Sequence, residues 1–133
     1  CGTTDPTPCE ARQSTFFKYD DPPALYAVDA DTETCMKTSA AENDPNPQWL
    51  SVDLELVRLI GTIRFRSDQG SASDFHVAVS TEGPADAAVL NPSSGALLPA
   101  ISESCAVSNV GDAVFEATCS AAVKGRHLFI SRS

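Results

Sequence analysis

The sequence predicts an all-β fold, a β-sandwich or jelly roll. The first observation is that several runs alternate apolar and polar residues with a period of two, which is typical of strands with one buried face. The second is that glycine, proline and serine separate these runs. The third is that no stretch with a helical period exceeds about two turns. Short strands with frequent turns favour a sandwich or jelly roll.

The N-terminal part predicts little regular structure before the first strand. Residues 1–9 hold two prolines and two cysteines and read as a tail or small disulfide loop, because proline cannot donate to a β-ladder. Residues 10–133 are expected to form one sandwich domain. A short helical turn is expected around residues 24–28, after the breaker Asp20-Asp21-Pro22-Pro23. Residues 39–48 are polar and rich in proline, which predicts a loop.

Five runs are predicted to be strands, because apolar side chains occupy every second position in them or because they are short, apolar and flanked by turn residues. They are residues 49–56, 59–65, 74–80, 114–118 and 127–130. The last two are predicted to be joined through Gly125. Residues 67–73 and 83–100 are rich in glycine, serine and proline and predict turns and an exposed loop.

Composition excludes several classes of function. The chain has 133 residues and a formal charge of −9, so a nucleic-acid partner is not expected, because such partners need a basic face. No apolar run approaches the roughly 20 residues of a membrane helix, so membrane insertion is not expected either. A cation is a more natural partner, unless the charge serves only solubility.

The five cysteines predict disulfides and hence an extracellular protein, because none forms a C-x-x-C pair. Five is an odd number, so at least one thiol is free or pairs outside the sequence. We expect Cys1 to pair with Cys9 and Cys35 to have a partner elsewhere. A Cys9–Cys35 bridge is the rival pairing.

No constellation of catalytic residues is present, so the protein is not expected to be an enzyme. There are two histidines, His76 and His127, and each lies in or beside a predicted strand. Neither a G-x-S-x-G nucleophile motif nor a glycine-rich phosphate loop occurs.

Separated segments along the chain together resemble one family. They are Ala11-Arg12-Gln13-Ser14, Ala27-Val28-Asp29-Ala30-Asp31, Cys35, Pro47-Gln48-Trp49 with Val52-Asp53-Leu54, residues 60–65, Cys105, Cys119 and Gly125-Arg126-His127-Leu128. In this order they resemble the F-type lectins (fucolectins) and their discoidin-like relatives. The resemblance implies an eight-stranded jelly roll, a disulfide between Cys105 and Cys119, and glycan recognition.

The fucose-binding pattern of the F-type lectins is incomplete here. That pattern has a histidine, an R-x-D triplet and a further basic residue. Arg66-Ser67-Asp68 supplies a triplet, but Ser39 and Ser73 stand at the other two positions. Lys37 lies nearest to the histidine position. We expect any surviving glycan site to use Lys37, Arg64 and Arg66, unless these are simply solvated strand residues.

An acidic segment predicts a calcium site. The run Asp29-Ala30-Asp31-Thr32-Glu33-Thr34 is rich in the oxygen atoms that calcium prefers, and its carboxylates would repel one another without a cation. The resemblance implies a ligand set of the Asp29 carboxylate, the carbonyls of Tyr26 and Asp31, and the carbonyl or hydroxyl of Thr34.

Two functions stay open at this point. The first is an extracellular, non-catalytic module that binds a glycan or a glycoprotein on a cell surface. The second is a structural module of an extracellular matrix, coat or filament, with neighbouring chains as partners. Two observations favour the second function. The fucose pattern is incomplete, and the strand that ends the family's fold does not follow Arg132-Ser133 in this sequence. That strand is expected to lie beyond the given sequence, to be supplied by another chain, or to be lost.

Overall fold

The computed structural model describes residues 9–13, 24–30, 34–36, 48–83 and 103–132, and these form an all-β jelly-roll sandwich. The elements, in chain order, are β1 (Glu10–Gln13), the 3₁₀ helix η1 (Ala24–Ala27), β2 (Gln48–Arg66), the 3₁₀ helix η2 (Ala72–Asp74), β3 (Phe75–Ser80), β4 (Glu103–Gly111) and β5 (Val114–Arg132). The all-β prediction and the short helical turn after residue 23 are confirmed.

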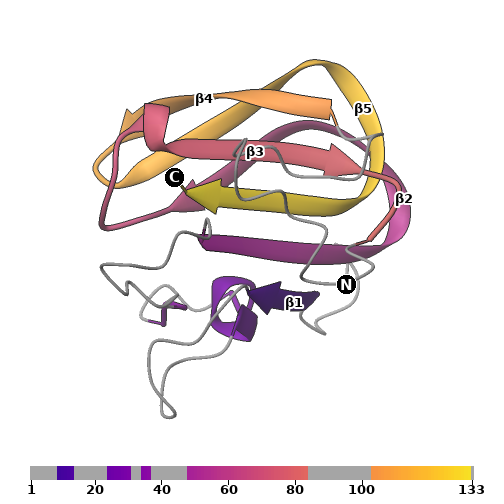
Figure 1. The fold of residues 1–133 in the computed structure, drawn as a ribbon, viewed down its shortest axis with the longest axis horizontal. Coiled ribbons are helices and arrows are strands. Elements are labelled where there is room, and N and C mark those ends of the chain that lie inside the picture. Colours follow the sequence, from indigo (N-terminus) through magenta and orange to yellow (C-terminus); the bar gives the residue numbers. More distant parts are fainter. Residues whose placement is uncertain (1–8, 14–23, 31–33, 37–47, 84–102, 133) are drawn as a thin grey trace.

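Two long strands build both layers of the sandwich. The strand order is β1-β2-β5-β3-β4, all neighbours are antiparallel, and β4 also pairs with β5. Figure 1 shows β2 and β5 curving together at the right-hand end and running back in the other layer. The first half of β2 therefore lies beside β1, and its second half lies against the part of β5 that pairs with β4.

The prediction of separate strands was wrong in two places. Residues 49–56 and 59–65 belong to one strand of 19 residues, and 114–118 and 127–130 belong to another of 19. Irregular pairing between Asp53 and Arg58 bends β2 without ending it, as β-bulges do. Within this bend Glu55 has φ of 65°, and Leu56, which was predicted to face the core, is 64% exposed.

Strand β4 was missed in the sequence. Eight of its nine residues are exposed or half-buried, so no alternation marks it. It forms a tight hairpin with β5 through Asp112 and Ala113, and Ala113 has a left-handed φ of 58°.

The main core lies between the two layers. Its buried members are aliphatic side chains from β2, β3 and β5 together with the Cys105–Cys119 disulfide, which is present as predicted. At one end the rings of Phe65, Phe75 and Phe115 pack on one another, with centroids 4.8–5.5 Å apart.

A second, smaller cluster lies on the layer formed by β1, the first half of β2, the second half of β5, and β3. It is on the face of that layer that points away from the main core. It contains Trp49, Ala78 and Phe129, all buried. In β3, Ala78 and Ser80 on this face are therefore buried as well, while His76 is exposed.

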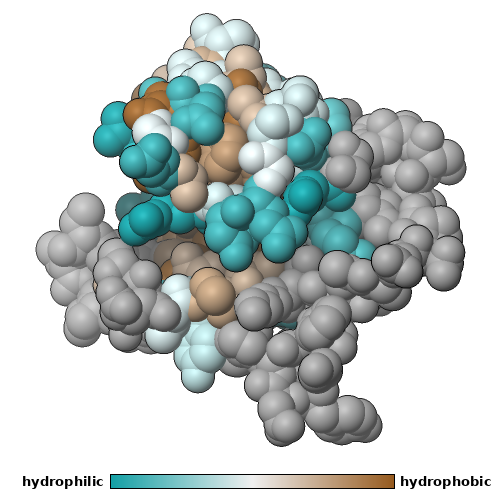
Figure 2. All heavy atoms as spheres, turned by 90° about the vertical axis from the view of Figure 1, so that its left-hand side faces the viewer, coloured by the Kyte–Doolittle hydropathy of each residue, from teal (hydrophilic) through white to brown (hydrophobic). Residues whose placement is uncertain are grey.

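The hairpin turn of β4 and β5 and the turn 67–74 lie together at one end of the sandwich. The amide of Ser67 donates a 3.0 Å hydrogen bond to the carbonyl of Ala113, which joins the two turns. Figure 2 views this end and shows a band of hydrophilic side chains across it.

The remaining cysteines bear on the predicted pairing. Cys9 is disulfide-bonded and Cys35 is a free, exposed thiol, so the rival Cys9–Cys35 bridge is wrong. Cys1, the partner expected for Cys9, lies outside the described residues. In the described ranges, no helix has the length and apolar character needed to cross a membrane.

Candidate functional site

A row of polar side chains crosses the four strands of one layer, which is formed by β1, the first half of β2, the second half of β5, and β3. Glu10 on β1 pairs with Asp53 on β2, Asp53 with His127 on β5, and His127 with Ser80 on β3. Residues directly opposite one another in antiparallel strands lie on the same face of the sheet. This face is the one that carries Trp49 and Phe129, and not the one that faces the main core.

A pocket of about 150 Å³ opens over this row. It is lined by Glu10, Arg12, Ser51, Asp53, Gly83 and His127. Drug-sized ligands occupy pockets of roughly 300–1,000 Å³, so the space suits one small polar group such as a single sugar residue. Carboxylate, guanidinium, hydroxyl and imidazole groups all border it.

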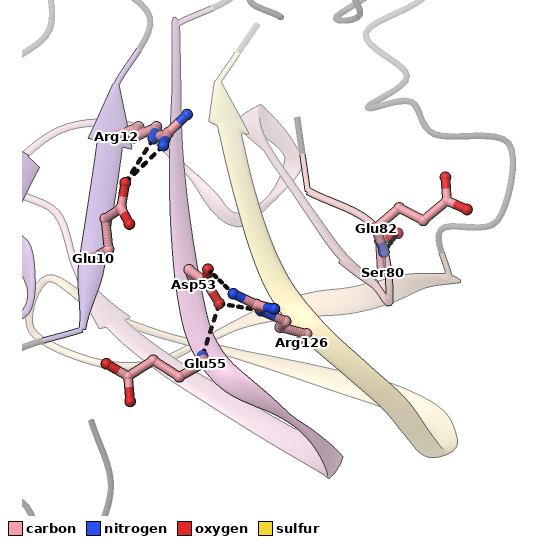
Figure 3. A network of polar contacts seen from close by, with 7 residues as sticks. All are labelled: Glu10, Arg12, Asp53, Glu55, Ser80, Glu82 and Arg126. Carbon is pink, nitrogen blue, oxygen red and sulfur yellow. Dashed lines mark hydrogen bonds and ion pairs between the residues drawn. The ribbon is translucent and has the colours of Figure 1, made fainter. Parts of the chain in front are cut away.

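Asp53 is the most constrained polar side chain of the pocket. Its two carboxylate oxygens accept hydrogen bonds of 2.7 Å from Nε and Nη2 of Arg126, and Oδ1 also accepts from the amide of Glu55 at 2.7 Å (Figure 3). These bonds, chiefly that from Arg126, lower the pKa of Asp53 to about 2. The same ion pair raises the pKa of Arg126. Asp53 thus remains ionised and fixed.

This ion pair joins two of the segments that carry the family resemblance. Asp53 belongs to Val52-Asp53-Leu54 and Arg126 to Gly125-Arg126-His127-Leu128. Asp53 also binds within the bend of β2, because its Oδ1 accepts from the amide of Glu55. The Asp53 side chain therefore contributes both to the bend, through the Glu55 amide, and to one wall of the pocket, through Arg126.

His127 forms another wall. Its half-buried ring lies against Gly83, where an added Cβ atom would stand 2.9 Å from the ring atom Cε1. Burial lowers the pKa of His127, so the imidazole is neutral at pH 7. The ring can therefore accept or donate a hydrogen bond without adding charge.

Glu10 and Arg12 form the exposed rim. Nε and Nη2 of Arg12 donate to Oε1 of Glu10 at 2.9 and 2.7 Å, and the two side chains are 63% and 59% exposed. Such an exposed pair contributes only about 0–1 kcal/mol. A ligand can therefore displace it at little cost.

The structure does not place the predicted basic cluster at this pocket. Arg64 and Arg66 lie on the outer, solvent-facing side of β2, eleven and thirteen residues beyond Asp53, and Lys37 lies outside the described residues. Arg64 donates a 2.6 Å hydrogen bond to Glu116 of β5. Its charge is therefore matched by a neighbouring carboxylate.

The described part of the predicted calcium loop has oxygen atoms close together. The Thr34 hydroxyl donates to Oδ2 of Asp29 at 2.8 Å. Tyr26 lies in η1, just before Asp29, and Asp31 lies outside the described residues. A carboxylate, a hydroxyl and backbone carbonyls suit calcium. In the described ranges, the described part of this loop included, no three His, Cys, Asp or Glu side chains gather around a possible metal position.

The sequence of residues 26–130 matches the F5/F8 type C family of NedA-like, galactose-binding domains. The chain belongs to this family. The discoidin-like part of the resemblance is confirmed by this match, which covers most of the chain. No curated protein matches the chain in sequence.

Solved structures of carbohydrate-binding modules share the fold. Chitosan-binding module 1 of a chitosanase/glucanase from Paenibacillus sp. IK-5 is 18% identical, with a TM-score of 0.66 over 94% of this chain and 82% of that one. The family 32 module of NanJ from C. perfringens, in complex with galactose, is 16% identical, with a TM-score of 0.60 over 92% and 80%. The lectin domain of lectinolysin, complexed with Lewis B antigen, is 19% identical, with a TM-score of 0.57 over 93% and 81%.

Sequence reasoning missed the pocket because its residues come from strands far apart in the chain. His127 was interpreted only as a surface or half-buried strand residue, and Asp53 only as part of a family segment. The structure shows His127 half-buried in β5. One signal was available: the acidic residue of one such segment and the basic residue of another carry opposite charges. Their pairing could have been predicted if the two segments had been assumed to be neighbours.

Proposed function

We propose that this domain is a non-catalytic carbohydrate-binding module of an extracellular protein and that it holds a sugar in the pocket between Glu10, Asp53 and His127. The observation that carries the proposal is the meeting of hydrogen-bond donors and acceptors from three strands around a sugar-sized space. Oxidised cysteines at Cys9 and at Cys105–Cys119 support the extracellular location.

The chemistry of the pocket suits sugar hydroxyls. A hydroxyl both donates and accepts, so it needs partners of both kinds. Here Glu10 and Asp53 accept, Arg12 donates, and the neutral imidazole of His127 can do either. Related folds that hold galactose, chitotriose and Lewis B antigen give further support.

The test is a glycan array on the purified protein, followed by calorimetry with the bound glycans. Arg12→Ala should weaken binding about tenfold or more, because a hydrogen bond to a charged group contributes roughly 1.5–3 kcal/mol. Arg64→Ala removes a cation from the other half of β2 and should leave the affinity unchanged.

Two results would contradict the pocket as the site. If Arg64→Ala or Arg66→Ala weakened binding and Arg12→Ala did not, the fucose-type cluster would be the site, as in an F-type lectin. If no glycan bound at all, the structural-module alternative would be favoured.

A calcium ion in the 26–34 loop is a second part of the proposal. The Asp29 carboxylate, the carbonyls of Tyr26 and Asp31, and a Thr34 oxygen would hold it, and it would fix the loop without taking part in chemistry. Millimolar calcium should stabilise the wild type by about 1 kcal/mol relative to chelator, given the weak affinities typical of extracellular modules.

Thermal unfolding measures this effect. Asp29→Ala should abolish the calcium-dependent shift, whereas Asp112→Ala, in the exposed β4–β5 turn, should keep it. An equal shift in both variants and the wild type, or none in the wild type, would rule out the loop site.

A further inference from the structure

The charged side chains that the structure describes around the pocket are already engaged in ion pairs. Glu10 accepts from Arg12, and Asp53 accepts two bonds from Arg126. Each pair is neutral as a whole, so hydrogen bonding rather than net charge selects the ligand. His127 differs from these residues, because no described residue forms a hydrogen bond with its ring, which is neutral at pH 7. Its nitrogens can therefore bind a ligand.

Gly83 lies against the edge of the His127 ring that carries both nitrogens. A Cβ atom added to Gly83 would stand 2.9 Å from Cε1, 3.1 Å from Nε2 and 3.4 Å from Nδ1. These three atoms form the outer edge of the imidazole, and both residues line the pocket. A side chain at position 83 would therefore cover the atoms with which the ring can bind a sugar.

The turn after β3 holds Gly83 in this place. Ser80, the last residue of β3, lies directly opposite His127 in the ladder and is buried. Its Oγ accepts a 3.0 Å hydrogen bond from the amide of Glu82 (Figure 3). This bond ties the residue before Gly83 to the end of the strand, next to the ring.

We propose that Gly83 is a specificity-determining residue of the pocket: its lack of a side chain leaves the nitrogen edge of His127 open to a hydroxyl group of a bound sugar. This inference rests on the proposed function and names the group that the imidazole recognises. A hydroxyl fits, because it can donate to one imidazole nitrogen or accept from the other. A larger residue at position 83 would cover this edge or push the ring into the pocket. Either change takes a hydrogen bond or space from the sugar.

The test is an NMR titration with galactose and with chitotriose, using the one that binds the wild type more tightly. Gly83→Ala should weaken binding about fivefold to tenfold, because a hydrogen bond between neutral groups is lost. Gly61→Ala, whose added Cβ would meet nothing within 4 Å, should leave the affinity unchanged. Without sugar, Gly83→Ala should already shift the ring signals of His127, and Gly61→Ala should not.

A double-mutant cycle separates this role from a general effect on the turn. His127→Ala should weaken binding by a similar factor. Adding Gly83→Ala to it should cost less than about twofold more, because no ring is left to cover. If Gly83→Ala instead destabilises the fold, the clash is with the ring, and the double variant should be as stable to heat as His127→Ala alone.

The outcomes distinguish this inference from the proposed function. Unchanged affinity in Gly83→Ala, or the same loss with and without the ring of His127, would overturn the inference and leave the proposed function standing. Absence of glycan binding by the wild type would refute the proposed function itself. Unshifted ring signals in sugar-free Gly83→Ala would overturn the inference whether or not a glycan binds.

Discussion

Replacing Gly125 with alanine is expected to destabilise the fold by about 2–3 kcal/mol, the upper range for overpacking a close-packed core. An ideal Cβ atom at this position would stand 2.1 Å from Cγ1 of Val79 and 3.2 Å from the carbonyl oxygen of Ser80. Val79 is 1% exposed and has no room to retreat, and the Ser80 contact is backbone. Strands β3 and β5 would have to separate next to the pocket.

Gly61→Ala is the matched control. Gly61 lies in β2, and its added Cβ would meet nothing within 4 Å. This variant should be neutral or slightly stabilising, since alanine restricts the unfolded chain more than glycine does. Urea unfolding of both variants gives the comparison. Equal stability of the two would show that β3 and β5 do not approach each other as described.

Asp53→Asn is expected to cost about 1–2 kcal/mol at pH 7, because the substitution removes the charge from a half-buried two-bond ion pair that solvent partly screens. The amide oxygen of asparagine can still accept from the Glu55 amide, so the bend of β2 should persist. The loss therefore reports mainly on the link between Asp53 and Arg126.

The pH dependence of the unfolding free energy tests the role of the Asp53 carboxylate independently. The pKa of Asp53 is about 2 in the folded protein, against an ordinary value of 3.8. The ion pair therefore stabilises the fold fully above pH ~4–5 and loses that effect as the pH falls through about 2. The difference in unfolding free energy between wild type and Asp53→Asn should shrink over this interval.

Glu116→Gln is the control for the ion pair. It also breaks an ion pair between β2 and β5, but its partner Arg64 is 72% exposed, so the cost should stay below about 1 kcal/mol. If Glu116→Gln cost as much as Asp53→Asn, or if the Asp53→Asn difference did not change with pH, the special role of the Asp53 pair would be contradicted.

The fold class could be predicted from the sequence because alternation marks strands wherever one face is buried. It holds in Phe75, Val77 and Val79, which are all buried. It fails in β4, which is largely exposed, and at Leu56, where irregular pairing turns the side chain outward. Bulges leave no clear local pattern, so the continuity of β2 and β5 could not be predicted.

The site was harder to predict, for a different reason. The pocket depends on which strands are neighbours: β1 and β5 meet β2 from positions about 40 and 75 residues away, a distance that periodicity does not bridge. The sequence directed attention to Arg64 and Arg66 because they match part of a motif. The structure places them on the outer face. The pocket residues Arg12 and His127 lie in segments that carry the resemblance, but they match no part of the fucose pattern.

The most direct test of the central claim is an NMR titration of isotope-labelled protein with galactose and with chitotriose, following the backbone amide signals. If the pocket holds the sugar, the largest shifts with at least one of them should come from Glu10 and Arg12, from Ser51 and Asp53, and from Gly83 and His127. The amides of Arg64 and Arg66 should stay in place. The largest shifts at Arg64 and Arg66, or none with either sugar, would contradict the claim.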